Sequence, residues 1–137
     1  MIRVAVAGAA GRMGLAVCAA IETAPDIELV GRADPLLETT LEQVLGDAEV
    51  LVDFTRPDTA LQNALACLRA GVHVVIGTTG FDVRRLEEAV SAPGERPANV
   101  FIAPNFAIDS TEAPNRCFAV ITFPARNDRT QVSASAL

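Results

Sequence analysis

The chain has 137 residues, of which 50% are apolar and 20% charged, and its formal net charge is −6. This length allows one domain with a buried core, and the apolar fraction excludes a disordered chain. All 11 basic residues are Arg, and the acidic balance argues against a protein that binds the phosphate backbone of nucleic acid.

Two further features bear on the compartment. No apolar run reaches the ~18 residues that a membrane span requires. A secretory signal peptide avoids the glycines and the arginine that interrupt the apolar start of the chain, which are Gly8, Gly11, Arg12 and Gly14. We therefore expect a cytoplasmic protein without a membrane partner.

The cysteines agree with this expectation. They are odd in number, widely spaced and set in apolar surroundings at Cys18, Cys67 and Cys117. Such a pattern is typical of buried, reduced thiols rather than of a disulfide framework.

The chain begins with an apolar strand pattern followed by a helical pattern. Ile2–Ala7 is short and rich in β-branched residues, which predicts a buried strand. Apolar residues at helical spacing follow Met13, and Pro25 predicts the end of that helix because proline cannot continue it. Ile27–Gly31 predicts a second strand, which ends close to Asp34.

The next segments repeat this order. Leu36–Leu45 predicts a short helix with Gly46 as its C-terminal cap. Val50–Phe54 predicts a third buried strand. Pro57 suits the first position of the following helix, and Gly71 suits its end.

Two more strands complete the pattern. Val72–Ile76 predicts the fourth strand, Asp82 can cap a helix that ends before Pro93, and Val100–Ala103 predicts the fifth strand. This alternation predicts a Rossmann-like α/β domain over residues 1–108, with a parallel sheet, right-handed crossovers and helices on both faces.

Residues 109–137 do not continue the pattern. They contain Pro114, Pro124 and a polar Ser/Thr-rich end, and only Phe118–Phe123 has the composition of a strand. We expect an irregular tail here.

A glycine-rich motif follows the first predicted strand directly. Gly8-Ala9-Ala10-Gly11-Arg12-Met13-Gly14 is a G-x-x-G-x-x-G variant, and Asp34 lies twenty residues beyond Gly14. Glycines allow a sharp turn and close approach of the backbone to a diphosphate, while the helix N-terminus directs N–H groups at it. The acid can accept hydrogen bonds from ribose hydroxyls. Together they predict binding of a nicotinamide dinucleotide, NADH or NADPH.

Alternatives remain for these residues. The glycines could serve only helix–strand packing, and an Asp before Pro is common in turns. Arg12 could meet a phosphate, including the 2′-phosphate of NADPH, or lie solvated on the helix.

Two other clusters follow predicted strands at the sheet edge where open parallel sheets bind ligands. One comprises Gly77, Thr78, Thr79 and Gly80, and the other comprises Ala103, Pro104, Asn105 and Phe106. Hydroxyl and amide groups suit a ribose or a carboxamide, although each cluster could also be a simple turn.

With these motifs the chain resembles the dihydrodipicolinate reductase (4-hydroxy-tetrahydrodipicolinate reductase) family. The resemblance rests on four segments spread over residues 1–108, namely Val6–Gly14, Val52–Pro57, Val75–Phe81 and Ala103–Ile108. It implies an NAD(P)H-dependent oxidoreductase of diaminopimelate and lysine biosynthesis.

The resemblance also implies roles for the clusters. Gly8, Ala9, Ala10, Gly11, Arg12 and Met13 would hold the diphosphate, and Asp34 the ribose. Gly77, Thr78 and Thr79 with Ala103, Pro104, Asn105 and Phe106 would flank the nicotinamide ribose and ring. Some family members have Arg directly after the acid to accept NADPH, whereas this chain has Pro35, so NADH use is at least as plausible.

The chain departs from the family after Ile108. The family's second domain carries an H-H-x-x-K-x-D-A-P-S-G-T stretch that handles protons and holds the dicarboxylate substrate. This chain has a single His, His73, which we interpret as a strand-entry residue, and it has no Lys. We therefore assign no catalytic residue and no metal ligand. We expect a reductase without its catalytic and tetramerisation domain, through truncation, a frame change or a split gene, with little activity alone.

Two other interpretations stay open at this point. The chain could be a non-catalytic NAD(P)-binding module, or a fragment that folds poorly because the tail leaves the sheet uncovered. The oligomeric state is also open.

Overall fold

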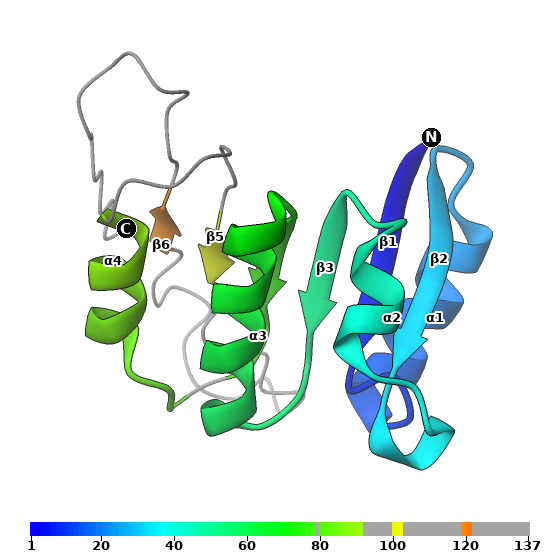
Figure 1. The fold of residues 1–137 in the computed structure, drawn as a ribbon. Helices are drawn as coiled ribbons and strands as arrows, with labels where there is room; N and C mark the ends of the chain where they lie inside the picture. Colours follow the sequence, from blue (N-terminus) through cyan, green and yellow to red (C-terminus); the bar gives the residue numbers. More distant parts are fainter. Residues whose placement is uncertain (79, 92–99, 103–118, 122–137) are drawn as a thin grey trace, which may run out of the picture.

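The computed structural model describes residues 1–78, 80–91, 100–102 and 119–121, which form one sheet with helices on both faces (Figure 1). The strands are β1 (Ile2–Ala7), β2 (Ile27–Ala33), β3 (Val50–Asp53), β4 (His73–Ile76), β5 (Val100–Ile102) and β6 (Ala119–Ile121). The helices are α1 (Arg12–Thr23), the 3₁₀ helix η1 (Pro35–Leu37), α2 (Leu41–Leu45), α3 (Pro57–Ala70) and α4 (Val83–Ser91).

The strand order is β2-β1-β3-β4-β5-β6. The first five strands are parallel, and β6 pairs with β5 in the antiparallel direction. The chain runs outward from β1 to β2, and then returns to the other side of β1 as β3. This reversal makes β1 and β3 the topological switch point, where doubly wound sheets bind their ligands.

Side chains on β1 alternate between two cores. Ala5 and Ala7 contribute to the larger core, which also contains Leu61 of α3 and Leu86 of α4. Val4 and Val6 face the smaller core, where α1 packs through buried Cys18 and Ile21. Helix α1 therefore covers one face of the sheet, and α2, α3 and α4 cover the other (Figure 1). The predicted Rossmann-like fold is confirmed.

Local signals in the sequence set most of the helix ends. Pro57 begins α3, and Gly71 ends it with a left-handed φ of 71° while its N–H bonds the last carbonyls of the helix. Asp82 caps α4, because its Oδ1 accepts the N–H of Arg85 at 3.2 Å. The first strand has its predicted bounds, and the others differ from the predictions by one or two residues. The strand expected within Phe118–Phe123 is present as β6.

The single helix predicted for Leu36–Leu45 is wrong. It is divided into η1 and α2, because Glu38 adopts a left-handed φ of 53° that ends the first turn. Thr40 then starts α2 anew through a capping box with Gln43, whose Oε1 accepts the N–H of Thr40 at 2.8 Å. Gly46 does follow α2, but it keeps a right-handed φ of −61°.

The cysteines that can be described are free and buried, as expected for Cys18 and Cys67. Cys117 lies outside the described residues. Within the part of the chain that the structure describes, no helix combines the length and apolarity needed to cross a bilayer.

Candidate functional site

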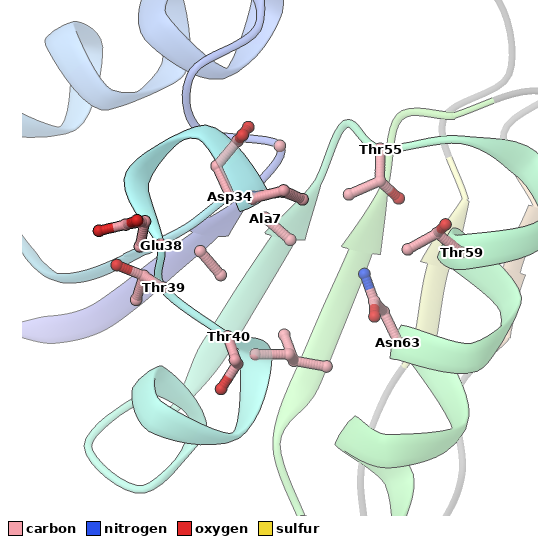
Figure 2. Close-up of a pocket in the computed structure, with 12 residues that line it drawn as sticks. Ala7, Asp34, Glu38, Thr39, Thr40, Thr55, Thr59 and Asn63 are labelled. Atoms are coloured by element: carbon pink, nitrogen blue, oxygen red, sulfur yellow. The ribbon is translucent and has the colours of Figure 1, made fainter.

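A pocket of about 410 Å³ opens at the switch point. Residues from the carboxyl ends of β1 and β2, from the segment between η1 and α2, from the turn after β3 and from α3 form its walls (Figure 2). The described residues that line it are Ala7, Gly8, Ala33, Asp34, Pro35, Glu38, Thr39, Thr40, Leu41, Thr55, Thr59 and Asn63. Its acidic members are Asp34 and Glu38, and none of these twelve residues is cationic.

The three glycines of the motif have different physical roles. Gly8 has a φ of +74°, and a Cβ on it would lie 2.5 Å from the carbonyl oxygen of Phe54. A Cβ on Gly14 would lie 1.9 Å from the carbonyl oxygen of Gly8, so any side chain there would push α1 away from the loop. At Gly11 the nearest atom would be 3.3 Å away. The fold thus requires glycine at positions 8 and 14, whereas a Cβ on Gly11 would make a tight contact that a shift of a few tenths of an ångström relieves.

Four consecutive N–H groups of the loop already have acceptors within the protein. The N–H groups of Gly8 and Ala9 point at the carbonyl of Ala33, at 2.9 and 3.4 Å. The N–H of Ala10 donates to Oδ2 of Asp34 at 3.0 Å, and that of Gly11 to the carbonyl of Gly8 at 3.1 Å. The loop is therefore braced by its own backbone and by one carboxylate.

The first turn of α1 is arranged differently. Gly11 is its N-cap residue, no side chain among the described residues caps it, and its first turn holds no acid. Arg12, at the first helical position, is exposed. A cation there is unfavourable by about 0.3–1 kcal/mol, because the N-terminus is the positive end of the helix dipole. The turn is suited to an external anion that would accept its N–H groups and meet the guanidinium.

Asp34 lies at the end of β2 and is only 8% exposed. Besides holding Ala10 through Oδ2, it accepts the N–H of Leu36 through Oδ1 at 2.9 Å and so caps η1. A carboxylate has about four acceptor positions, so two remain for hydroxyl groups of a ligand. Figure 2 shows Asp34 on the wall of the pocket opposite Thr59 and Asn63.

A second buried carboxylate, Asp53, connects the neighbouring elements. It is 0% exposed at the end of β3. Its Oδ1 accepts the N–H and the hydroxyl of Thr55 at 2.9 and 2.6 Å, and its Oδ2 accepts the side-chain amide of Asn63 at 2.7 Å. Thr78 approaches Oδ1 at 3.5 Å from the end of β4. Asp53 thereby fixes two pocket residues, Thr55 and Asn63, relative to the turn after β4.

Phe54 packs between the glycine loop after β1 and the turn after β4. Its carbonyl lies against Gly8, and its ring would be 2.2 Å from a Cβ on Gly77. Glycine at position 77 is therefore required by packing against Phe54. This packing places the turn after β4 beside the glycine loop.

The predicted nicotinamide clusters are only partly described. The hydroxyl of Thr78 faces inward, with Asp53 and the carbonyl of Thr55 as its acceptors, and the residue is 9% exposed. Thr79 and the cluster Ala103, Pro104, Asn105 and Phe106 lie outside the described residues. His73 is the first residue of β4, at the end of the strand away from the pocket, as its interpretation as a strand-entry residue requires.

Cys67 of α3 is fully buried near Asp53. Burial and, to a lesser extent, the negative charge of Asp53 raise the pKa of its thiol from 9.0 to about 12. The thiol is therefore protonated at neutral pH and is unsuited to act as a nucleophile.

The family model for the N-terminus of dihydrodipicolinate reductase matches residues 2–106. The chain belongs to this family. It corresponds to the N-terminal, dinucleotide-binding domain, as the four sequence motifs predicted.

Curated relatives agree with the assignment. The chain is 48% identical to the 4-hydroxy-tetrahydrodipicolinate reductase of Nocardia farcinica over 110 residues, which cover 78% of the chain and 43% of the relative. It is 41% identical to that of Bifidobacterium animalis over 133 residues, which cover 90% of the chain and 50% of the relative. The chain thus spans about half the length of these dihydrodipicolinate reductases.

A solved structure of the family has the same fold. The dipicolinate-bound dihydrodipicolinate reductase from Paenisporosarcina sp. TG-14 is 29% identical, with a TM-score of 0.67. The match covers 79% of this chain and 49% of that one.

The glycine loop and Asp34 were predicted from the sequence, whereas no individual role was predicted for Asp53, Thr55, Thr59 or Asn63. The signal available for the first two was their place in the Val52–Pro57 family segment. Asn63 lies at a buried position of α3 among small apolar residues, and a polar side chain there indicates a buried partner.

Proposed function

We propose that this chain is the cofactor-binding part of a 4-hydroxy-tetrahydrodipicolinate reductase. The reaction is reduction of 4-hydroxy-tetrahydrodipicolinate to tetrahydrodipicolinate in diaminopimelate and lysine biosynthesis, with NADH or NADPH as the hydride donor. One observation carries the proposal: the uncapped first turn of α1 opens at the switch point beside a pocket bordered by Asp34.

Different residues bind different parts of the dinucleotide. The diphosphate lies against the N–H groups at the start of α1, where Gly11 leaves room and Arg12 adds positive charge. The adenosine ribose bonds Asp34, and the adenine occupies the pocket toward Thr55, Thr59 and Asn63. Gly77, Thr78 and Thr79 with Ala103, Pro104, Asn105 and Phe106 flank the nicotinamide ribose and ring.

The bound dihydronicotinamide supplies the hydride, while the protein contributes position and electrostatics. The proton-handling stretch of the family's second domain is absent from these 137 residues, which contain one His and no Lys. We therefore propose that the chain binds the cofactor in the cytoplasm but reduces its substrate weakly or not at all by itself.

Calorimetric titration with NADH and NADPH, followed by an assay of nicotinamide absorbance with freshly made substrate, tests this proposal. We expect saturable binding with one equivalent of nucleotide and little turnover. Absence of binding by the folded chain would contradict cofactor binding. Turnover equal to that of a full-length reductase would contradict the assigned need for a second domain.

A non-catalytic NAD(P)-binding module is the second candidate. The position of His73 at the amino end of β4 favours it, because the chain's one imidazole is then remote from the pocket. The two candidates are separated by adding the second domain of a related reductase in trans. Recovery of turnover supports the reductase, and continued inactivity of the folded mixture supports the binding module.

A further inference from the structure

One N–H group of the loop that follows β1 is held by a side chain from outside the loop. Its own backbone and the carbonyl of Ala33 satisfy the N–H groups of Gly8, Ala9 and Gly11. The N–H of Ala10 instead depends on a side chain, Oδ2 of Asp34 at 3.0 Å. Ala10 lies two residues before α1, so its orientation sets the direction in which the first turn of α1 opens.

Asp34 is well suited to fix that orientation. It is 8% exposed, and both carboxylate oxygens are held by backbone N–H groups, of Ala10 on one side and of Leu36 on the other. Because β1 and β2 are paired through Ala7 and Ala33, the carboxylate is attached to the same rigid sheet edge as the loop. Charge-assisted hydrogen bonds of this kind are stronger than those between neutral groups.

We infer that Asp34 is a positioning residue for diphosphate binding, in addition to its proposed contact with the ribose. By holding Ala10 it keeps the N–H groups of Arg12, Met13 and Gly14 directed at one place, where an anion can accept them. This inference rests on the proposed function, since it concerns the loop that would bind the diphosphate of the dinucleotide.

A nucleotide without ribose hydroxyls separates the two roles. In 2′,3′-dideoxyadenosine diphosphate the groups that would bond Asp34 are missing, but the diphosphate is intact. If Asp34 served only the ribose, its substitution would leave the affinity for this nucleotide unchanged. If only its negative charge mattered, removing that charge would strengthen binding of the diphosphate, because like charges repel.

Asp34→Asn is the appropriate variant. An Asn side chain has one acceptor oxygen and one NH₂ group, so it accepts from Ala10 or from Leu36 but not from both in the present geometry. Asn remains a good N-cap residue, so η1 can stay capped while the loop loses its brace. Asp82→Asn is the matched control, because it makes the same change at the cap of α4, far along the chain from the loop.

We expect Asp34→Asn to bind the dideoxy nucleotide about tenfold more weakly than the unsubstituted chain, and ADP more weakly still. Asp82→Asn should bind both nucleotides as the unsubstituted chain does. Unchanged or tighter binding of the dideoxy nucleotide by Asp34→Asn would overturn the inference. Failure of the unsubstituted chain to bind ADP or NADH would instead overturn the proposed function.

Hydrogen exchange on the unsubstituted chain gives a test that does not depend on the variant's folding. Without nucleotide, the amide of Ala10 should exchange slowly, and the amides of Arg12 and Met13 should exchange fast. Fast exchange at Ala10 would mean that Asp34 does not hold this N–H group, and it would overturn the inference whatever the behaviour of Asp34→Asn.

Discussion

At the scale of single residues, the glycines of the Gly8–Gly14 motif have different roles. Gly8 and Gly14 are required by backbone contacts of 2.5 and 1.9 Å that a Cβ would make, so their substitution tests the fold. Gly11 has its nearest such contact at 3.3 Å and adopts an ordinary extended conformation, with φ −75° and ψ 169°. It is therefore the position where a side chain affects the ligand more than the protein.

Gly11→Val should retain a cooperative thermal transition and lose NADH binding, because its methyl groups would occupy the space that the diphosphate needs. Circular dichroism and calorimetric titration provide the two measurements. Gly46→Val is the matched control, since a Cβ there would meet nothing within 4 Å. NADH binding by Gly11→Val with normal affinity would mean that the diphosphate lies elsewhere.

The site residues for which the sequence predicted no role share one property. Their roles depend on partners that are distant in the sequence. Asp53 bonds Asn63 ten residues away and Thr78 twenty-five residues away. Periodicity identifies Asp53 only as the end of an apolar strand. The motif Gly8–Gly14 was recognisable because its turn, its glycines and its helix are contiguous in the chain.

At the scale of the elements, local signals predicted strands and helices well where tertiary contacts agreed with them. The failure at Leu36–Leu45 has a specific cause. The spacing of apolar residues suits one helix, but Asp34 and Thr39 pair as an isolated bridge and force a turn between them. The turn brings Thr39 and Thr40 to the pocket wall, so the pocket depends on the break that the sequence pattern did not reveal (Figure 2).

The position of Arg12 at the start of helix α1 leads to a prediction at this scale. Arg12→Glu should raise the free energy of unfolding of the unliganded chain by about 0.5–1 kcal/mol, because an acid suits the positive end of a helix. The same change should weaken NADH binding, since it places a carboxylate beside the diphosphate. Chemical denaturation and calorimetry measure the two effects.

Arg84→Glu provides the comparison, because Arg84 is exposed in the first turn of α4, which also lacks an acid. It should leave NADH binding unchanged. Equal NADH affinity in Arg12→Glu and Arg84→Glu would contradict the role of α1.

At the scale of the whole molecule, the amino-acid composition bears on how stability depends on alkaline pH. The sequence has no Lys and no Tyr, so cysteine is the one side-chain type in it whose ordinary pKa lies between about 8 and 11. In the folded chain the pKa of Cys67 is raised from 9.0 to about 12, mainly by burial. Its neutral thiol thus contributes stability that is fully present below pH 9.

As the pH rises above 9, the unfolded chain loses the Cys67 proton while the folded chain keeps it. The free energy of unfolding should therefore fall, by up to about 1.4 kcal/mol per pH unit, until the folded thiol also ionises near pH 12. Urea unfolding at several alkaline pH values in the presence of a reductant measures this. Cys67→Ala should have a smaller slope, and an unchanged slope would show that Cys67 is not the group responsible.

Cofactor binding by this chain depends most on the first turn of α1, where the diphosphate is expected to bind. Amide NMR during titration with NADH tests this directly. We expect the largest shifts at Arg12, Met13 and Gly14, with smaller shifts at Ala10, whose N–H keeps Asp34 as its acceptor. If NADH binds and these three amides do not move, the diphosphate lies elsewhere and the central claim is wrong.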